Sequence, residues 1–176
     1  MNKKPTVAII MGSDSDYDTL KPAISFLKKC GIAMDVQVMS AHRTPDLAKD
    51  YAKNAEKQGI DVVIAAAGKA AHLPGVIAAF TTLPVIGVPI NCGEFDGMDA
   101  LLSIVQMPSG IPVATVGVNA AENAAILAVQ MLSLKYPSLK EELSRFKEEL
   151  KIQVMNKNQR LKEKLRHEGI ETESTL

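Results

Sequence analysis

Short apolar runs alternate with longer amphipathic segments along most of the chain. Five runs are apolar without a regular polar alternation, which is typical of strands buried on both faces. They cover residues 6–11, 34–39, 61–67, 84–88 and 112–118. Strands of this kind, separated by helices, predict a parallel sheet with helices on both sides. The pattern therefore indicates an α/β doubly wound domain, most simply of the flavodoxin-like type.

Helical spacing fills the gaps between these runs. One helix is expected around Leu20 to Lys28, before Gly31, and a second has Leu47, Tyr51 and Ala55 at helical spacing before Gly59. Three more are expected near residues 74–82, 98–106 and 121–134.

The character of the chain changes after Tyr136, where Lys and Glu become abundant. Apolar residues recur at intervals of four, three and four, at Leu139, Leu143, Phe146 and Leu150. Ser138 followed by Glu141 matches a capping box at the start of an amphipathic helix. A helix continuing towards Leu165 would overrun a domain of this size, so its apolar stripe packs either on its own domain or on a neighbouring subunit.

These boundaries divide the chain into three parts. Residues 1–136 are expected to form a single α/β catalytic domain, and residues 137–167 a C-terminal helix that packs on a neighbouring subunit. Residues 168–176 are expected to form a disordered tail.

Composition limits the number of domains, the class of partner and the compartment to be expected. With 176 residues, of which 47% are hydrophobic, the chain can bury one good core. Its formal net charge is zero and it has no basic stripe interleaved with aromatics, so nucleic acid is not an expected partner. No run approaches the roughly 20 apolar residues of a membrane span. Cys30 and Cys92 form no disulfide framework, so we expect a reduced, soluble, cytoplasmic protein.

Ligands of open parallel sheets bind beyond the carboxyl ends of the strands, so the loops after the strands matter most. The first reads GSDSDYDTL, residues 12–20. Small hydroxyl residues at the start of a helix offer backbone N–H groups and side-chain donors to an anion. Three other interpretations stay open: Ser15 or Asp16 as a helix cap, a phosphatase with an Asp nucleophile in DYDTL, and a calcium loop, which the missing Gly and Glu disfavour.

The second loop reads SAHRTP, residues 40–45. Thr44 and Pro45 fit the N-cap and first position of a helix, which places His42 and Arg43 at the mouth of the site. The planar donor fork of Arg43 suits phosphate oxygens. His42 has the side chain best suited to give and take a proton near neutral pH, although a loop histidine is often only a surface group.

The third loop reads AGKAAHLPG, residues 67–75. Gly68, Ala70 and Ala71 permit a close approach of backbone to ligand, and His72 stands where another helix begins. A zinc site from His42, His72 and Cys92 lacks supporting spacing, and no G-x-S-x-G motif suggests a serine nucleophile. From the residues alone we predict a phosphate-bearing small molecule held by Ser13, Ser15 and Arg43, with a histidine over its reactive part.

Five segments in these positions resemble the class I form of the phosphoribosylaminoimidazole carboxylase family of purine biosynthesis. They are MGSDSD, SAHRTP, AAHLPG, LPVIGVPI and DALLSIVQMPSGIPVATV, within residues 6–134. The resemblance implies a three-layer α/β/α fold and a homo-octamer with sites near subunit contacts. It also implies a mutase reaction, in which a carboxylate moves from N5 of N5-carboxyaminoimidazole ribonucleotide to ring carbon C4, without metal or cofactor.

The resemblance also assigns roles to residues. Ser13, Ser15 and Arg43 would bind the 5′-phosphate, Asp16 the ribose hydroxyls, and His42 would be the general acid and base. The other substrate-binding positions that it implies are Ser40, Gly68, Lys69, Ala70, His72 and Leu73.

One position departs from the class I pattern, which usually has a second Gly where this chain has Lys69. Lys69 favours a resemblance to the CO2-using class II carboxylases. The resemblance to class I is favoured by Arg43, Thr44, Pro45 and His72. A class II-type carboxylase and a non-catalytic nucleotide-binding module therefore stay as alternatives. Lys69 either holds a substrate carboxylate or points to solvent, and the sequence does not choose between them.

Overall fold

The computed structural model describes residues 4–93 and 95–170, with five parallel strands in one sheet. The strands are β1 (Thr6–Met11), β2 (Ala33–Val38), β3 (Val62–Gly68), β4 (Val85–Ile90) and β5 (Ala114–Thr115), in the order β2-β1-β3-β4-β5. The helices are η1 (Asp14–Asp16), α1 (Tyr17–Lys29), α2 (Pro45–Asn54), α3 (Leu73–Phe80), α4 (Met98–Val105), α5 (Ala121–Ser133) and α6 (Ser138–His167). This strand order is flavodoxin-like, so the predicted doubly wound fold is confirmed.

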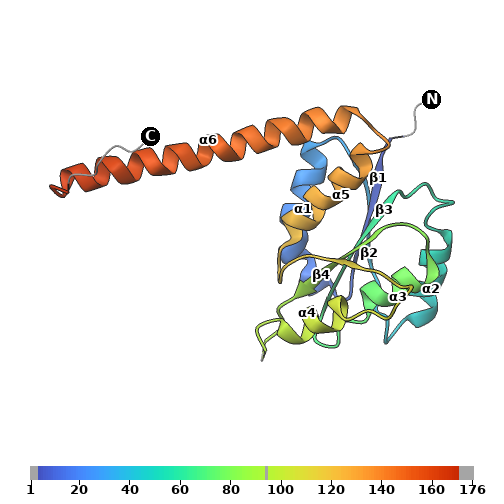
Figure 1. Cartoon of the computed structure of the whole chain (residues 1–176). Helices are drawn as coiled ribbons and strands as arrows, with labels where there is room; N and C mark the ends of the chain where they lie inside the picture. Colours follow the sequence, from blue (N-terminus) through green and yellow to red (C-terminus); the bar gives the residue numbers. More distant parts are fainter. Residues whose placement is uncertain (1–3, 94, 171–176) are drawn as a thin grey trace.

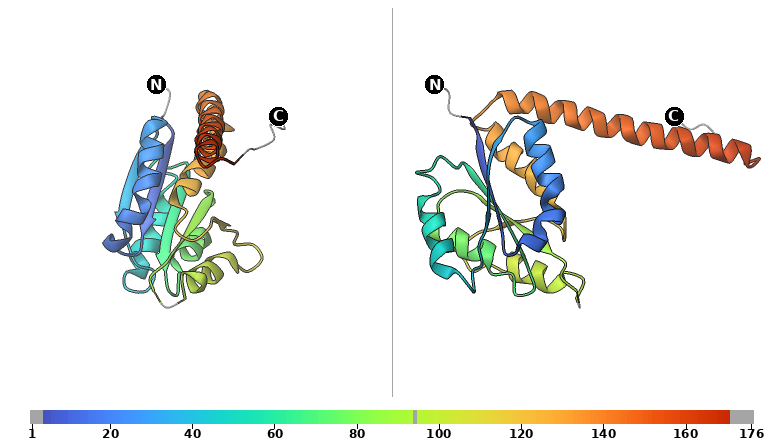
Figure 2. Two further views of the ribbon diagram at one scale, coloured as in Figure 1. Left: turned by 90° about the vertical axis from the view of Figure 1, so that its left-hand side faces the viewer. Right: turned by 180° about the vertical axis from the view of Figure 1, so that it is seen from behind.

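Helices cover both faces of the sheet, giving three layers (Figure 1). Successive side chains of a strand point to opposite faces, so β1 supplies Val7, Ile9 and Met11 to one core and Ala8 and Ile10 to the other. The first core packs against α1 and α5, and the second against α2, α3 and α4. Figure 2 shows the same layers from two further sides. Burial on both faces explains why these strands read as continuous apolar runs.

Close packing of α4 on β4 depends on Gly87. A Cβ atom at this position would collide with the side chains of Ile104 and Val113. The glycine therefore lets α4 lie close against β4. The loop after β4 forms one wall of the candidate site.

Two predicted details are wrong. The run 112–118 forms only a two-residue strand, because Pro112 has no N–H to pair and the chain then follows β4 through separate bonds, such as Val116 N–H to the Gly87 carbonyl at 3.1 Å. Leu47 is 52% exposed rather than turned to the core. The buried side of α2 is formed instead by Ala48, Ala52 and, just after the helix, Ala55.

The first turns of α6 pack on the body of the same chain. Leu139 is buried, and Phe146 meets Phe26 of α1 edge to face with ring centroids 4.9 Å apart. Lys29 and Glu149 form an ion pair at 2.7 Å between the same two helices. The predicted capping box is wrong, because the helix already includes Ser138 and its N-cap, Pro137, makes no side-chain cap bond.

Beyond Leu150, α6 projects away from the sheet and its helices (Figure 1, Figure 2). Ile152, Val154, Met155 and Leu161 are all about half exposed or more on this outer part. Packing of α6 on a neighbouring subunit stays a prediction. Of the predicted tail, residues 171–176 lie outside the described residues. Among the described residues, no helix is both long and apolar enough to cross a membrane.

Candidate active site

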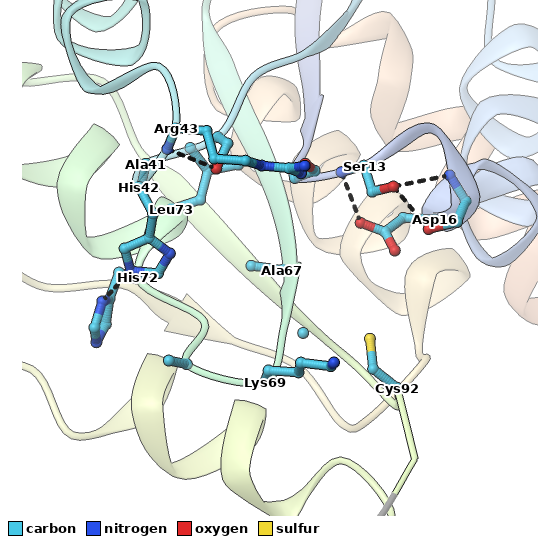
Figure 3. A pocket seen from close by; sticks show the side chains of 15 residues that line it. Ser13, Asp16, Ala41, His42, Arg43, Ala67, Lys69, His72, Leu73 and Cys92 are labelled. Atoms are coloured by element: carbon cyan, nitrogen blue, oxygen red, sulfur yellow. Dashed lines mark hydrogen bonds between the residues drawn. The ribbon is translucent and has the colours of Figure 1, made fainter.

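A cavity of about 650 Å³ opens at the carboxyl ends of β1 to β4 (Figure 3). It lies where the strand order reverses between β1 and β3, which is the usual ligand position in this architecture. Its lining brings together the residues that the sequence singled out: Ser13, Ser15, Asp16, Ser40, His42, Arg43, Gly68, Lys69, Ala70, His72 and Leu73. Gly12, Ala41, Ala67 and Cys92 also line it and were not assigned to the ligand from the sequence.

The first loop is held by a capping box built on Ser13. The Ser15 N–H donates to Ser13 Oγ at 3.3 Å, and the Ser13 N–H donates to Asp16 Oδ2 at 3.2 Å. The alternative in which Ser15 or Asp16 caps the first helix holds only for the position of Asp16. Ser13 caps the short η1 turn, and Asp16 stands at the N-cap of α1 without a side-chain cap bond. The turn keeps the two serine hydroxyls together, with Ser15 Oγ 2.8 Å from Ser13 Oγ.

Asp16 is the most enclosed charged group of this loop, with 6% of its surface exposed. Burial raises the pKa of its carboxyl above the ordinary value, against hydrogen bonds involving Ser13 and Ser15 that lower it. Asp16 is the last residue of the η1 turn, whereas the nucleophile of the phosphatase alternative would stand directly at the end of β1. A partly desolvated acceptor of this kind is suited to neutral hydroxyl donors.

The second loop is a tight turn that Thr44 closes. Thr44 Oγ1 accepts from the Ser40 N–H at 2.9 Å and lies 3.0 Å from the Ser40 carbonyl, to which it donates. Thr44 stands at the N-cap of α2, as predicted, but its side chain binds this turn and not the helix. Ser40 Oγ in turn accepts from the Arg43 N–H at 3.1 Å. These bonds fix the backbone that carries His42 and Arg43.

Arg43 reaches across the mouth of the cavity towards the first loop (Figure 3). Its Nη2 lies 3.4 Å from the Gly12 carbonyl, a long hydrogen bond that uses one of the five guanidinium donors. The guanidinium thus contacts the residue before Ser13, in the same cavity as the two serine hydroxyls. Together with the N-terminus of the first helical turn, these groups form a site for an anion such as a phosphate.

The backbone of the third loop lies close to Cys92, which follows β4. A Cβ atom at Gly68 would collide with Cys92 Sγ, so glycine is required there by the packing of the two loops. Lys69 has a φ of 57°, in the left-handed region that glycine adopts more readily. His72 is the N-cap residue of α3, and the buried Leu73 and Pro74 anchor the helix behind it.

His42 and His72 form a direct pair inside the cavity. His42 Nε2 lies 2.7 Å from His72 Nδ1, and the two rings meet edge to face with centroids 4.8 Å apart. One nitrogen must donate and the other accept, so a single proton lies between them. Such a pair can pass a proton to or from a bound molecule near neutral pH.

Residues in the described ranges include no group of three or more His, Cys, Asp or Glu that could hold a metal ion. In the histidine pair, His42 Nε2 and His72 Nδ1 face each other, so a metal could be bound only through the other nitrogen of each ring. Burial raises the pKa of the Cys92 thiol, and the charge of Lys69 partly opposes that rise. The thiol therefore does not have the lowered pKa of an activated nucleophile.

Comparisons with known proteins identify the family of the chain. The chain is 55% identical to the N5-carboxyaminoimidazole ribonucleotide mutase of Pyrococcus horikoshii, over 92% of each chain. It is 53% identical to the mutase of Thermotoga maritima, over 90% of this chain and 93% of the relative. The crystal structure of Treponema denticola PurE superposes with a TM-score of 0.80 at 30% identity, covering 90% of this chain and 99% of that one. Residues 6–153 match the family described as AIR carboxylase, and the chain belongs to that family.

Proposed function

We propose that this chain is an N5-carboxyaminoimidazole ribonucleotide mutase of purine biosynthesis, which produces 4-carboxy-5-aminoimidazole ribonucleotide. The observation that carries the proposal is the His42–His72 pair, which shares one cavity with the serine and arginine anion site. A ribonucleotide held by its phosphate at one side of this cavity would place its base near a proton donor and acceptor. The names of relatives above 50% identity support the same reaction.

Binding of the ribonucleotide would use the first two loops. The 5′-phosphate would lie against Ser13, Ser15 and Arg43, where donors and positive charge gather. Asp16 would accept hydrogen bonds from the ribose hydroxyls, since its carboxylate lies in the cavity wall and is partly desolvated. The aminoimidazole would then lie towards the third loop and the histidine pair.

The chemistry requires one group to give and then take a proton. His42 would protonate N5 as the N5–carboxylate bond breaks, which releases CO2 and aminoimidazole ribonucleotide. Ring carbon C4 would then attack the CO2 carbon, and His42 would remove the proton that C4 carries. The proton given in the first step is recovered in the second, so His42 returns to its starting state. The protein would need to hold CO2 between the two steps.

Retention of CO2 bears on the assembly. In the single chain His42, Lys69 and His72 are exposed, so the cavity is open to water on that side. Met98, Leu102 and Val105 of α4, the helix that follows the Cys92 wall, are also about half exposed. We include in the proposal a homo-octamer in the cytoplasm, in which neighbouring copies cover these apolar side chains and close the sites.

The proposal is tested by a choice of substrates. Purified protein treated with a chelator is supplied either with N5-carboxyaminoimidazole ribonucleotide or with aminoimidazole ribonucleotide and bicarbonate. Faster formation of the C4-carboxylated product from the first supports the mutase. Preference for the second would establish a CO2-using carboxylase instead. Tight binding of either nucleotide without any reaction would leave a nucleotide-binding module.

A further inference from the structure

Lys69 is an unusual choice for its place in the third loop. Its neighbours Gly68 and Ala70 are small, and its φ of 57° is one that glycine adopts with less strain. The side chain lines the cavity and runs along the wall towards Cys92 (Figure 3). A long cationic side chain here therefore occupies a position where the backbone alone would favour glycine.

Among the described residues that line the cavity, Arg43 and Lys69 are the two of basic type other than histidine. They come from different loops, after β2 and β3, and lie on different walls (Figure 3). Arg43 contacts the Gly12 carbonyl, at the start of the loop that carries Ser13 and Ser15. Lys69 is on the Cys92 side, close enough for its charge to lower the pKa of that thiol against the effect of burial.

The substrate of the proposed reaction also has two separate anionic groups. One is the 5′-phosphate, which the first two loops would bind, and the other is the carboxylate carried on N5 before the reaction and on C4 after it. The intermediate aminoimidazole ribonucleotide keeps the phosphate but has lost the carboxylate. Two cations on different walls therefore match two anions at different ends of one molecule.

Resting on the proposed function, we propose that Lys69 determines specificity by pairing with the migrating carboxylate of substrate and product. The ammonium group binds the carboxylated nucleotides and has no partner in the aminoimidazole ribonucleotide. Because the carboxylate loses its charge as CO2 forms, the pairing is stronger in the ground state than near the CO2 stage. Loss of the ammonium group should then raise KM and leave kcat unchanged or higher.

The test compares two ligands that differ by one carboxylate. Calorimetry measures binding of 4-carboxy-5-aminoimidazole ribonucleotide and of aminoimidazole ribonucleotide to the full chain and to variants. Lys69→Met removes the charge but keeps the length, and Lys69→Gly also relieves the backbone. We expect both variants to bind 4-carboxy-5-aminoimidazole ribonucleotide about tenfold more weakly. Their affinity for aminoimidazole ribonucleotide should change less than about twofold. Lys69→Arg should keep most of the discrimination, and Lys57→Met, outside the cavity, should have no effect.

The outcomes separate the two proposals. If Lys69→Met lowers the affinity for both ligands equally, or for neither ligand, the role of Lys69 is overturned while the mutase proposal stays intact. Failure of the unaltered protein to bind either nucleotide would overturn the mutase proposal, and the role of Lys69 with it. A fall in kcat at constant KM would also exclude carboxylate pairing in the ground state.

Discussion

His42 Nε2 and His72 Nδ1 lie 2.7 Å apart, although the two residues belong to loops that follow different strands. The strands β2 and β3 flank β1 in the sheet, so the pair spans the mouth of the cavity above the end of β1. His72 stands at the start of a helix whose next residues are buried, so the backbone position of His72 is well restrained. The contact therefore restrains the ring orientation of His42 and couples its tautomer to that of His72.

Replacing His72 should lower turnover without loss of nucleotide binding. In His72→Leu the ring of His42 loses the partner at Nε2, so we expect kcat to fall about 10- to 100-fold with KM for the nucleotide little changed. His72→Gln, whose amide can restore one hydrogen bond, should recover part of kcat. The pH profile of kcat should also shift in His72→Leu. An unchanged profile and kcat would show that His72 does not position His42.

Replacing His42 should remove the chemistry and leave the binding. His42→Asn keeps a polar group but cannot exchange a proton near neutral pH, so we expect kcat to fall at least about 10³-fold. Binding of aminoimidazole ribonucleotide, measured by calorimetry, should stay within about threefold of the unaltered protein. Near-normal turnover in this variant would remove His42 from the mechanism.

Replacing Arg43 should affect only ligands that carry a phosphate. Arg43→Met removes the planar donor group beside Ser13 and Ser15, and we expect aminoimidazole ribonucleotide to bind about 10- to 100-fold more weakly. The matching ribonucleoside, which lacks the phosphate, should bind equally to both proteins. Arg43→Lys should fall in between, because it keeps the charge but not the fork. A loss of affinity for both ligands would point to a distorted loop instead.

Asp16 should make stability depend on pH in a defined direction. Because burial raises the pKa of its carboxyl, the folded chain holds a proton more tightly than the unfolded chain does. Its contribution to the free energy of unfolding therefore falls as pH rises from the ordinary carboxyl pKa of 3.8 through the raised value. Asp16→Asn should lack this fall, so it should gain stability relative to the unaltered protein between acidic and neutral pH.

Urea unfolding of both proteins at several pH values checks this expectation. The same variant should bind the ribonucleotide more weakly, since an amide is a poorer acceptor for two ribose hydroxyls. A difference in unfolding free energy that stays constant with pH would contradict the assigned origin of the shift.

The two halves of α6 should differ in their contribution to the stability of the chain. Phe146 packs edge to face on Phe26, so Phe146→Ala should lower the free energy of unfolding by about 2 kcal/mol. Leu161 is 54% exposed on the outer half, and Leu161→Ala should change it by less than about 0.5 kcal/mol in dilute protein. Similar effects of the two substitutions would show that the outer half also contacts the body.

The position of the site could be predicted from sequence because parallel strands bring their carboxyl ends to one edge. Once five apolar runs were identified, GSDSD, SAHRTP and AGKAAHLPG had to meet there. From the sequence Cys92 enters only the disfavoured zinc alternative and not the substrate cavity, although it also follows a strand. Its closeness to Gly68 depends on how two loops pack, which no local pattern reports.

Hydrogen-bond partners were less predictable than positions. Ser13, Ser15 and Asp16 all fit a cap, and only the η1 turn decides that Ser13 accepts the bond. The same holds for Thr44, whose hydroxyl closes its own turn. The His42–His72 contact joins residues 30 positions apart, so it follows from sheet order and loop shape and not from spacing.

The outer half of α6 should contribute to association between chains and not to the folding of a single chain. A helix of 30 residues is about 45 Å long, and the last of its described residues that packs on the core of the body is Phe146. Mutations beyond that point should leave the unfolding of an isolated chain almost unchanged. Their effects would appear only when molecules meet, as a melting temperature or an activity that depends on protein concentration. A chain with a damaged outer helix could therefore fold normally and still fail at working dilution.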